Sequence, residues 1–325
     1  MLAQVLRPLK EVYGGIQPSD LLIGLEAPDD AIVWRVDDAR ALVVTTDFFT
    51  PVVDDPYNYG AIAAANALSD IYAMGGDPFL ALSIAAFPPQ LPAEFLAEII
   101  RGGAEMAKSA GVIIAGGHTI QDTEPKFGLV VLGWVDPAMV LAKKGLLPGD
   151  KLLLTKPLGF GVTTTALKRG IAADEDVTEV IGWMKKLNRE ASHLARQHHA
   201  HSCTDVTGFS LIGHSLEMAE ASGVGLKIHF HSIPLISCAV KYAREWAFPG
   251  GASDNMIIYG PKVQYDLELE DYQKMLLYDP QTSGGLLIGL SEDDAEAYLI
   301  EAIKIGQPAW VIGEVIDGKD IEIVG

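Results

Sequence analysis

The chain has 325 residues, of which 49% are hydrophobic and 21% are charged. This composition excludes intrinsic disorder, and the length predicts two domains of roughly 150 residues each. The formal net charge of −19 would repel a phosphate backbone, so nucleic acid is excluded as an expected partner.

No stretch of the sequence predicts a membrane partner. The longest charge-free run, from Pro78 to Ala93, contains four prolines and is shorter than the roughly 20 apolar residues that cross a bilayer. The N-terminal residues lack the apolar core and cleavage site of a signal peptide. Cys203 and Cys238 are the only cysteines, which excludes a disulfide framework and an all-cysteine zinc site. We therefore expect a cytoplasmic protein.

In the first half, short β-branched runs alternate with alanine-rich helical stretches. The pattern predicts strands at Ala31–Val36, Ala41–Thr46, Phe79–Phe87, Val112–Gly117 and Phe127–Val135. It predicts helices at Tyr59–Met74, which Gly75-Gly76 would end, and at Pro92–Ala110.

A turn-forming tetrad, Leu147–Asp150, predicts a boundary between domain 1–148 and domain 149–325. The second half predicts helices at Val162–Arg169, Glu175–His199, Leu211–Ala221 and Asp293–Ile305. It predicts a strand that runs into glycine-rich turns within KLLLTKPLGFG (151–161), and strands at Gly225–Phe230, Gly285–Gly289 and Ala309–Gly313. The fold class is therefore a two-domain mixture of α and β.

Carboxylates are concentrated between residues 29 and 70. Most of them read as turn residues, but Asp30, Asp47 and Asp70 adjoin apolar strands or lie inside an apolar helix. A carboxylate next to buried apolar surface is costly unless it is paired or metal-bound. Oxygen ligands without histidine or cysteine favour Mg²⁺ over Zn²⁺. Spacing alone leaves a Mg²⁺–phosphate site and a structural role equally open.

Glycines follow a predicted strand at Gly116-Gly117-His118-Thr119. Such a loop can offer backbone N–H groups to phosphate oxygens. Taken alone, an ordinary tight turn is the favoured interpretation.

A compact polar segment, Cys203–Phe209, precedes another apolar run. Its Asp205 either caps the following helix, which is favoured on the residues alone, or extends a carboxylate metal site. His198, His199 and His201 precede it and are more typical of a solvated helix end than of a metal site.

Several long segments, in the same order, resemble selenophosphate synthetase, the selenide, water dikinase family. They are Ala27–Ala31, TTDFFTPVVDDPYNYG (45–60), ANALSDIYAMGGDP (65–78), AGGHTI (115–120), LTKPLGFGV (154–162), TDVTGFSLIGH (204–214), PGG (249–251) and DPQTSGGLL (279–287). The resemblance covers nearly the whole chain. Ser210 stands where the family usually has glycine, and we expect serine, in ordinary backbone angles, to have little effect there unless φ is positive.

The resemblance implies an ATP-dependent reaction of selenide with water that gives selenophosphate, phosphate and AMP. It implies an N-terminal α/β domain whose sheet forms a β-barrel in a homodimer, and a C-terminal α+β domain. It implies Mg²⁺ as cofactor and ATP as substrate, and leaves a requirement for K⁺ open.

Matched position by position, the resemblance places the Mg²⁺ ligands at Asp30, Asp70 and Asp205. It implies nucleotide contacts at Ala27, Pro28, Asp29, Asp47, Asp70, Gly116, Gly117 and His118, and Asn66 adjoins this group as a further expected contact.

The family also carries an N-terminal glycine-rich segment with a reactive cysteine or selenocysteine and an ATP-contacting lysine. Here no cysteine precedes Cys203, and Lys10 stands too far along the chain to replace that lysine. We expect a shortened chain, such as one read from a start downstream of a selenocysteine codon. The catalytic nucleophile is then not assigned, and the activity of the chain as written stays open.

Two other functions stay open on the sequence. One is a related phosphotransferase of the same superfamily, similar to thiamine-monophosphate kinase. The other is an ATP-binding regulatory subunit without catalysis. The product distinguishes the related phosphotransferase from a selenide, water dikinase. The dikinase forms AMP from ATP in a selenide-dependent reaction, whereas the phosphotransferase forms ADP.

Overall fold

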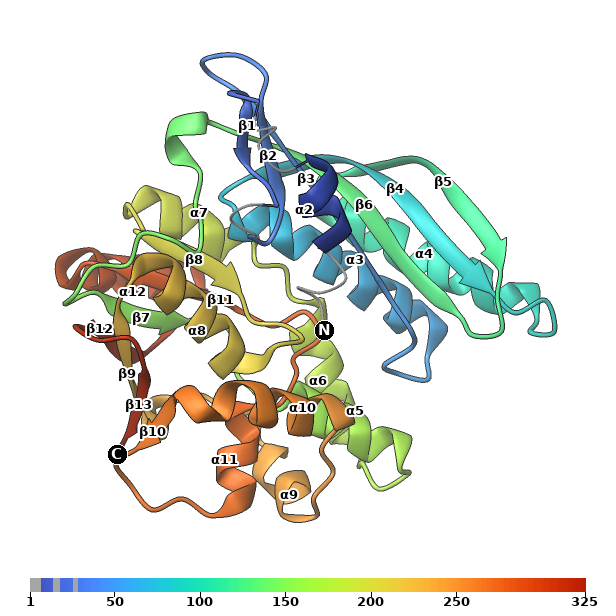
Figure 1. The fold of residues 1–325 in the computed structure, drawn as a ribbon. Helices are drawn as coiled ribbons and strands as arrows, with labels where there is room; N and C mark the ends of the chain where they lie inside the picture. The colour runs from blue at the N-terminus through green and yellow to red at the C-terminus, as the bar shows by residue number, and fades with distance from the viewer. Residues whose placement is uncertain (1–6, 14–17, 26–28) are drawn as a thin grey trace.

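A computed structural model describes residues 7–13, 18–25 and 29–325 of the chain. Two mixed sheets follow one another along the sequence, with helices packed on each (Figure 1). The first has the strand order β1-β2-β3-β6-β4-β5 and the second β10-β13-β9-β12-β7-β11-β8. The expected two-domain α/β class with mixed sheets is therefore confirmed at this level, while the domain limits stay a prediction.

The first sheet is antiparallel except where β4 and β5 run parallel at one edge. Its strands are β1 (Leu21–Ile23), β2 (Ile32–Arg35), β3 (Ala41–Phe49), β4 (Asp77–Phe87), β5 (Ile113–Gln121) and β6 (Lys126–Val135).

Two helices, α3 (Pro56–Ala73) and α4 (Ala93–Ser109), cover one face of this sheet (Figure 1). Asp55 caps α3 by accepting a hydrogen bond from the backbone N–H of Asn58 at 2.7 Å. The helices approach closely at Gly60, where a Cβ would lie 1.9 Å from the carbonyl oxygen of Ile99. Every residue of α3 from Tyr59 onward is buried, so α3 lies at the centre of the molecule.

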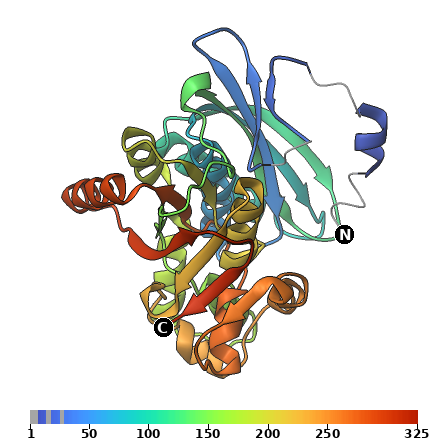
Figure 2. The ribbon, with the colours of Figure 1, turned by 60° about the vertical axis from the view of Figure 1, so that its left-hand side comes forward.

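The opposite face of the first sheet is open (Figure 2). Side chains alternate across a strand, and residues paired across the sheet share a face. The open face carries large apolar side chains that are 40 to 68% exposed: Ile32, Trp34, Phe48, Leu82, Ile113 and Ile120. The short helix α2 (Arg7–Tyr13) leaves its own Val12 and Tyr13 exposed.

The second sheet contains strands from the second half of the chain only. They are β7 (Lys151–Leu154), β8 (Ser202–Asp205), β9 (Gly225–His229), β10 (Val263–Tyr265), β11 (Leu286–Leu290), β12 (Trp310–Ile316) and β13 (Ile321–Val324). The helices are α5 (Phe160–Lys168), α6 (Asp174–Lys185), α7 (Arg189–Gln197), α8 (Ser210–Ser222), α9 (Ala239–Arg244), α10 (Gly250–Tyr259), α11 (Asp271–Leu277) and α12 (Glu292–Ile305).

The continuous helix expected at Glu175–His199 is wrong, because the chain breaks between α6 and α7. Lys186 adopts extended angles of φ −67° and ψ 121°, which ends α6. The buried amide of Asn188 then donates hydrogen bonds to Ser69 Oγ at 2.8 Å and to the carbonyl oxygen of Gly284 at 2.9 Å. The break therefore joins the two halves of the chain next to α3.

None of the helices within the described ranges is both long enough and apolar enough to cross a membrane.

Candidate functional site

Strand β3 and helix α3 bring together the first carboxylates. Asn66 and Asp70 are four residues apart on α3 and therefore share a helix face. Asn66 Nδ2 donates to Asp47 Oδ2 at 2.6 Å, and Thr45 Oγ1 donates to Asp70 Oδ2 at 2.5 Å. Thr45 and Asp47 lie two residues apart on β3, so both side chains face the helix. The sheet and its covering helix thus hold two acids side by side.

The second half of the chain adds Asp205, at the end of β8. Ser69 Oγ donates to Asp205 Oδ2 at 2.6 Å across the contact between the two halves. Helix α8 begins at Ser210 with no side-chain cap, so the favoured prediction that Asp205 caps this helix is wrong. Its side chain faces Asp70 and the other acids instead, because α3 packs against β8.

Asp30 completes the group from the start of β2. Thr204 Oγ1 donates to Asp30 Oδ1 at 2.9 Å, and Lys143 Nζ lies 3.1 Å from the same oxygen. The other oxygen, Oδ2, is buried and has no hydrogen-bond partner among the described residues. The neighbouring Asp29 accepts the backbone N–H of Lys143 at 3.0 Å.

The buried acids raise one another's pKa values. Burial, and then the charges of Asp205, Asp47 and Asp30, raise the pKa of Asp70 well above 3.8. Burial and the charge of Asp30 raise the pKa of Asp205 to about 7. Burial raises the pKa of Asp47 to about 6, although its bond from Asn66 opposes the shift. Burial and the charge of Asp30 also raise the pKa of Asp29 to about 7. A cation bound among these acids would relieve the repulsion between them.

The residues fit Mg²⁺ in combination with phosphate oxygens. In the part of the chain that the structure describes, no three His, Cys, Asp or Glu side chains are close enough together to form a metal site alone. Mg²⁺ usually binds one or two carboxylates and takes its other ligands from water and substrate phosphates. The unpartnered Oδ2 of Asp30 and the mutually repelling acids around it match this arrangement.

A cavity of about 480 Å³ opens next to these acids on the exposed side of the sheet. Its walls come from Asp29, Asp30, Thr45, Thr46 and Val130, among others. The size is that of a site for a small molecule. Asp30 thus connects the carboxylate group with a cavity that a nucleotide could enter.

The predicted glycine loop is wrong, because Gly116, Gly117 and His118 lie inside strand β5 at the edge of the sheet. A row of paired residues connects Asp47 through Leu129 and Ser83 to Gly117. Asp47 and Gly117, at the two ends of this row, are three strand spacings apart, which is roughly 14 Å.

His118 pairs with Ile84 and therefore lies on the open face, away from the carboxylates on the helix side. Within one chain the structure does not bring these three residues to the acids. The predicted contacts at Ala27 and Pro28 lie outside the described residues.

The histidine cluster forms no metal site within the described ranges. His198 lies 3.0 Å from Glu301, and His201 lies 2.9 Å from Asp150, so each ring pairs with its own carboxylate. The expectation of a solvated helix end holds for His199, whose side chain is 79% exposed, but not for His198, whose side chain is 14% exposed.

Sequence reasoning missed Lys156 and Ser283, although both lie in quoted motifs. Lys156 Nζ donates to the carbonyl oxygen of Ser283 at 2.7 Å, and the backbone N–H of Ser283 donates to Asn66 Oδ1 at 2.8 Å. Burial lowers the pKa of Lys156 to about 7. Lys156 lies in LTKPLGFGV and Ser283 in DPQTSGGLL, so the two motifs marked both residues as candidates. The sequence did not show that these residues contact each other.

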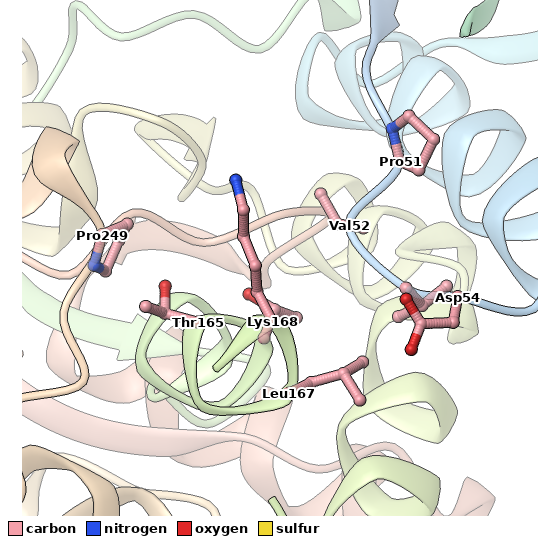
Figure 3. Close-up of a pocket in the computed structure, with 9 residues that line it drawn as sticks. Pro51, Val52, Asp54, Thr165, Leu167, Lys168 and Pro249 are labelled. Carbon is pink, nitrogen blue, oxygen red and sulfur yellow. The ribbon is translucent and has the colours of Figure 1, made fainter. Parts of the chain in front are cut away.

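A second cavity, of about 450 Å³, lies between the segment after β3 and helix α5. Pro51, Val52 and Asp54 line one side of it and Thr165 and Lys168 the other, and in the view the Lys168 side chain ends between Pro249 and Val52 (Figure 3). None of the predicted site residues lines it.

Comparison with known proteins identifies the family. The description "AIR synthase related protein, N-terminal domain" matches residues 28–135, and "AIR synthase related protein, C-terminal domain" matches residues 148–325. The chain is 45% identical to the selenide, water dikinase of Carboxydothermus hydrogenoformans, over 99% of this chain and 92% of that protein. It is 46% identical to the protein of the same name from Caldanaerobacter subterraneus subsp. tengcongensis, with the same coverage of each. The chain belongs to the selenide, water dikinase family.

Solved structures show the same fold at lower identity. Thiamine-monophosphate kinase from Stenotrophomonas maltophilia has a TM-score of 0.72 and 19% identity, over 98% of this chain and 96% of that one. The hydrogenase maturation protein HypE of E. coli has a TM-score of 0.67 and 20% identity, over 100% and 94%. These likenesses concern the fold alone, whereas the similarity to selenide, water dikinases extends over nearly the whole chain.

Proposed function

We propose that this chain catalyses the ATP-dependent conversion of selenide and water into selenophosphate, phosphate and AMP. The observation that carries the proposal is 41–46% identity, over nearly the whole chain, to proteins named selenide, water dikinase. The buried carboxylates from both halves of the chain supply the type of site that a Mg²⁺–ATP complex needs.

Asp30, Asp70 and Asp205 would hold the Mg²⁺, and their nearest neighbours fix their orientation. Thr45, Ser69 and Thr204 each donate a hydroxyl hydrogen bond to one of these acids. Mg²⁺ bound there would neutralise the charge that develops on the phosphate oxygens during transfer. Asp29, Asp47 and Asn66 would contact the nucleotide from the edge of the same group. A requirement for K⁺ is left to experiment.

We further propose that the chain forms a homodimer through the open face of the first sheet, and that the two sheets close into a barrel. Its strands carry several exposed large apolar side chains, and no helix of the described residues packs on this face, which is typical of an interface. A dimer would also give Gly116, Gly117 and His118 a role, because an edge strand on this face can reach the other subunit's nucleotide site. The three residues are too far from the acids of their own chain.

The reaction is tested by incubating the protein anaerobically with ATP, Mg²⁺ and selenide and following phosphorus by NMR. We expect selenophosphate, phosphate and AMP, with no AMP when selenide is omitted. The assay is run on the chain as printed and on the chain preceded by the cysteine-containing segment that the family resemblance implies. Selenide-independent formation of ADP by both proteins would contradict the proposal.

The site assignment is tested separately with Asp70→Ala. Turnover should fall by about a hundredfold or more, since removal of one preorganised electrostatic group costs this much in other enzymes. Circular dichroism should show an intact fold. Turnover within twofold of the unsubstituted protein would overturn the assignment of Asp70.

A further inference from the structure

A line of polar side chains, of which Glu217 is 33% exposed, leads away from the carboxylate site on the side of helix α8. Lys143 Nζ lies 3.1 Å from Asp30 Oδ1 and 2.9 Å from Glu217 Oε2. Glu217 Oε2 lies 3.3 Å from His214 Nδ1, and His214 Nε2 lies 3.2 Å from Thr207 Oγ1. None of these residues beyond Asp30 belongs to the site proposed above.

Lys143 holds the acidic pair at two points. Its ammonium group approaches Asp30, and its backbone N–H donates to Asp29 Oδ2 at 3.0 Å. Thr204 donates to the same Oδ1 atom, so one oxygen of Asp30 is engaged, while the other, Oδ2, is buried and has no partner within residues 7–13, 18–25 and 29–325. A carboxylate held in this way can offer a cation one oxygen in a fixed direction.

Lys143 is itself held in place. Its side chain is 11% exposed, and the backbone around it is tied down because Ser202 Oγ donates to the carbonyl oxygen of Lys143 at 2.6 Å. His214 is 5% exposed, and its ring packs 5.6 Å from that of Phe209. Burial alone would raise the pKa of Glu217, but His214 and Lys143 lower it to about 2. Glu217 is therefore ionised and keeps the ammonium group between two carboxylates.

We propose that Lys143, supported by Glu217 and His214, is a positioning residue that presents Oδ2 of Asp30 to the divalent cation of the bound nucleotide. The inference rests on the proposed Mg²⁺–ATP site and adds residues to it that no family match assigned. It also gives a role to the histidine of the segment Thr204–His214. Residues that orient a metal ligand typically change metal affinity by about 10- to 100-fold when they are replaced.

The test is metal affinity and does not need turnover. Mn²⁺ replaces Mg²⁺, and its binding is followed by electron paramagnetic resonance in the presence of a non-hydrolysable ATP analogue. Lys143→Met, which keeps the length of the side chain, should weaken Mn²⁺ binding about tenfold or more. The control is Lys151→Met, which removes another lysine paired with carboxylates, Glu292 and Glu314, and should leave Mn²⁺ affinity unchanged.

A double variant separates positioning from a general loss of structure. Glu217→Gln should weaken Mn²⁺ binding less than Lys143→Met does, because the amide oxygen still accepts from the lysine. The double variant should bind Mn²⁺ as weakly as Lys143→Met alone, because both changes act through the same ammonium group. Additive losses would overturn the inference.

The outcomes also separate the inference from the proposed function. If the unsubstituted protein does not bind Mn²⁺ with the nucleotide, the proposed site itself is wrong. If it binds and Lys143→Met binds equally well, the positioning role of Lys143 is wrong while the proposed function stands. If Lys143→Met does not fold, Glu217→Gln and His214→Gln decide, and unchanged affinity in both would overturn the inference.

Discussion

Two buried serines adopt backbone angles that normally belong to glycine. Ser210 has a φ of +69° and Ser283 a φ of +55°, and both are 0% exposed. The hydroxyl groups of both lack a hydrogen-bond partner among the described residues. The expectation of ordinary angles at Ser210 is therefore wrong, and the family's usual glycine has a physical reason there. At Ser283 the strain lies next to the carboxylate site, where strained residues often serve function.

Ser210→Gly should stabilise the protein. A side chain in the left-handed region costs about 1 kcal/mol or more, and glycine avoids this cost. We expect the free energy of unfolding in urea to rise by about 1 kcal/mol. Ser215→Gly, in the interior of the same helix, is the matched control and should lower it by about 0.5 kcal/mol. A decrease for Ser210→Gly would contradict the assignment of strain.

At the residue level, the sequence identified the acids better than their partners. Asp30, Asp47 and Asp70 could be singled out because a carboxylate next to apolar residues needs a partner. Lys143 could not, because its contact with Asp30 spans more than a hundred residues. Capping of a helix by Asp205 was favoured for the same reason, since local sequence does not show Ser69.

The acids also predict how stability depends on pH. Asp47, Asp70 and Asp205 have raised pKa values, so the folded protein binds their protons more tightly than the unfolded chain does. Their contribution to stability is fully present below the unfolded pKa of 3.8 and is lost as the pH rises toward about 7. Surface acids with lowered pKa values make the protein more stable as the pH rises, which is the opposite effect. The contribution of the buried acids is therefore measured by comparing the protein with a variant that lacks one of them.

Asp70→Asn is that variant. Without divalent cations, its melting temperature should rise relative to the unsubstituted protein as the pH increases from 4 to about 7, because the amide cannot ionise. Calorimetry over this pH range measures the difference, which Mg²⁺ with a nucleotide should reverse. A difference that is constant with pH would contradict the raised pKa of Asp70.

At the scale of elements, helix α5 depends on a segment more than a hundred residues away. Asp279 Oδ2 accepts the backbone N–H of Val162 at 3.1 Å, and Gln281 Oε1 accepts those of Gly159 and Phe160 at 3.1 and 3.0 Å. These are the free amides of a helix N-terminus. The motif DPQTSGGLL thus has a structural function in addition to its contact with Asn66.

Asp279→Ala should destabilise the protein by about 2 kcal/mol, because a buried amide loses its acceptor. Asp279→Asn keeps an acceptor oxygen and should cost less. Urea unfolding of both variants measures the difference. Equal losses would show that Asp279 acts through charge instead of through capping.

Helices and strands with a clear hydrophobic periodicity could be predicted from the sequence. Those that form only because of contacts with distant parts of the chain could not. Helix α3 was expected at Tyr59–Met74 and is found at Pro56–Ala73. Strand β8 was not predicted, because its four polar and small residues carry no strand pattern and form a strand by pairing with β11. Strand β5 continues beyond its predicted end at Gly117 to Gln121 because β4 offers it a parallel partner.

At the scale of the molecule, the open face of the first sheet predicts association. Leu82 lies on β4 within this face and is 40% exposed, and Phe48 on β3 is 51% exposed. Charges placed there would have to be buried without partners in the proposed dimer, which costs several kcal/mol. We therefore expect the unsubstituted protein to be a dimer in light scattering, and Leu82→Glu and Phe48→Glu to be folded monomers.

The dimer also makes a prediction about the nucleotide. If the edge strand β5 completes the partner's site, Leu82→Glu should bind the ATP analogue at least about tenfold more weakly, although it keeps every carboxylate. Ile303→Glu, at a side chain on α12 that is 78% exposed, is the matched control and should change neither mass nor affinity. Monomeric Leu82→Glu with unchanged affinity would confine the nucleotide site to a single chain, and a monomeric unsubstituted protein would refute the dimer itself.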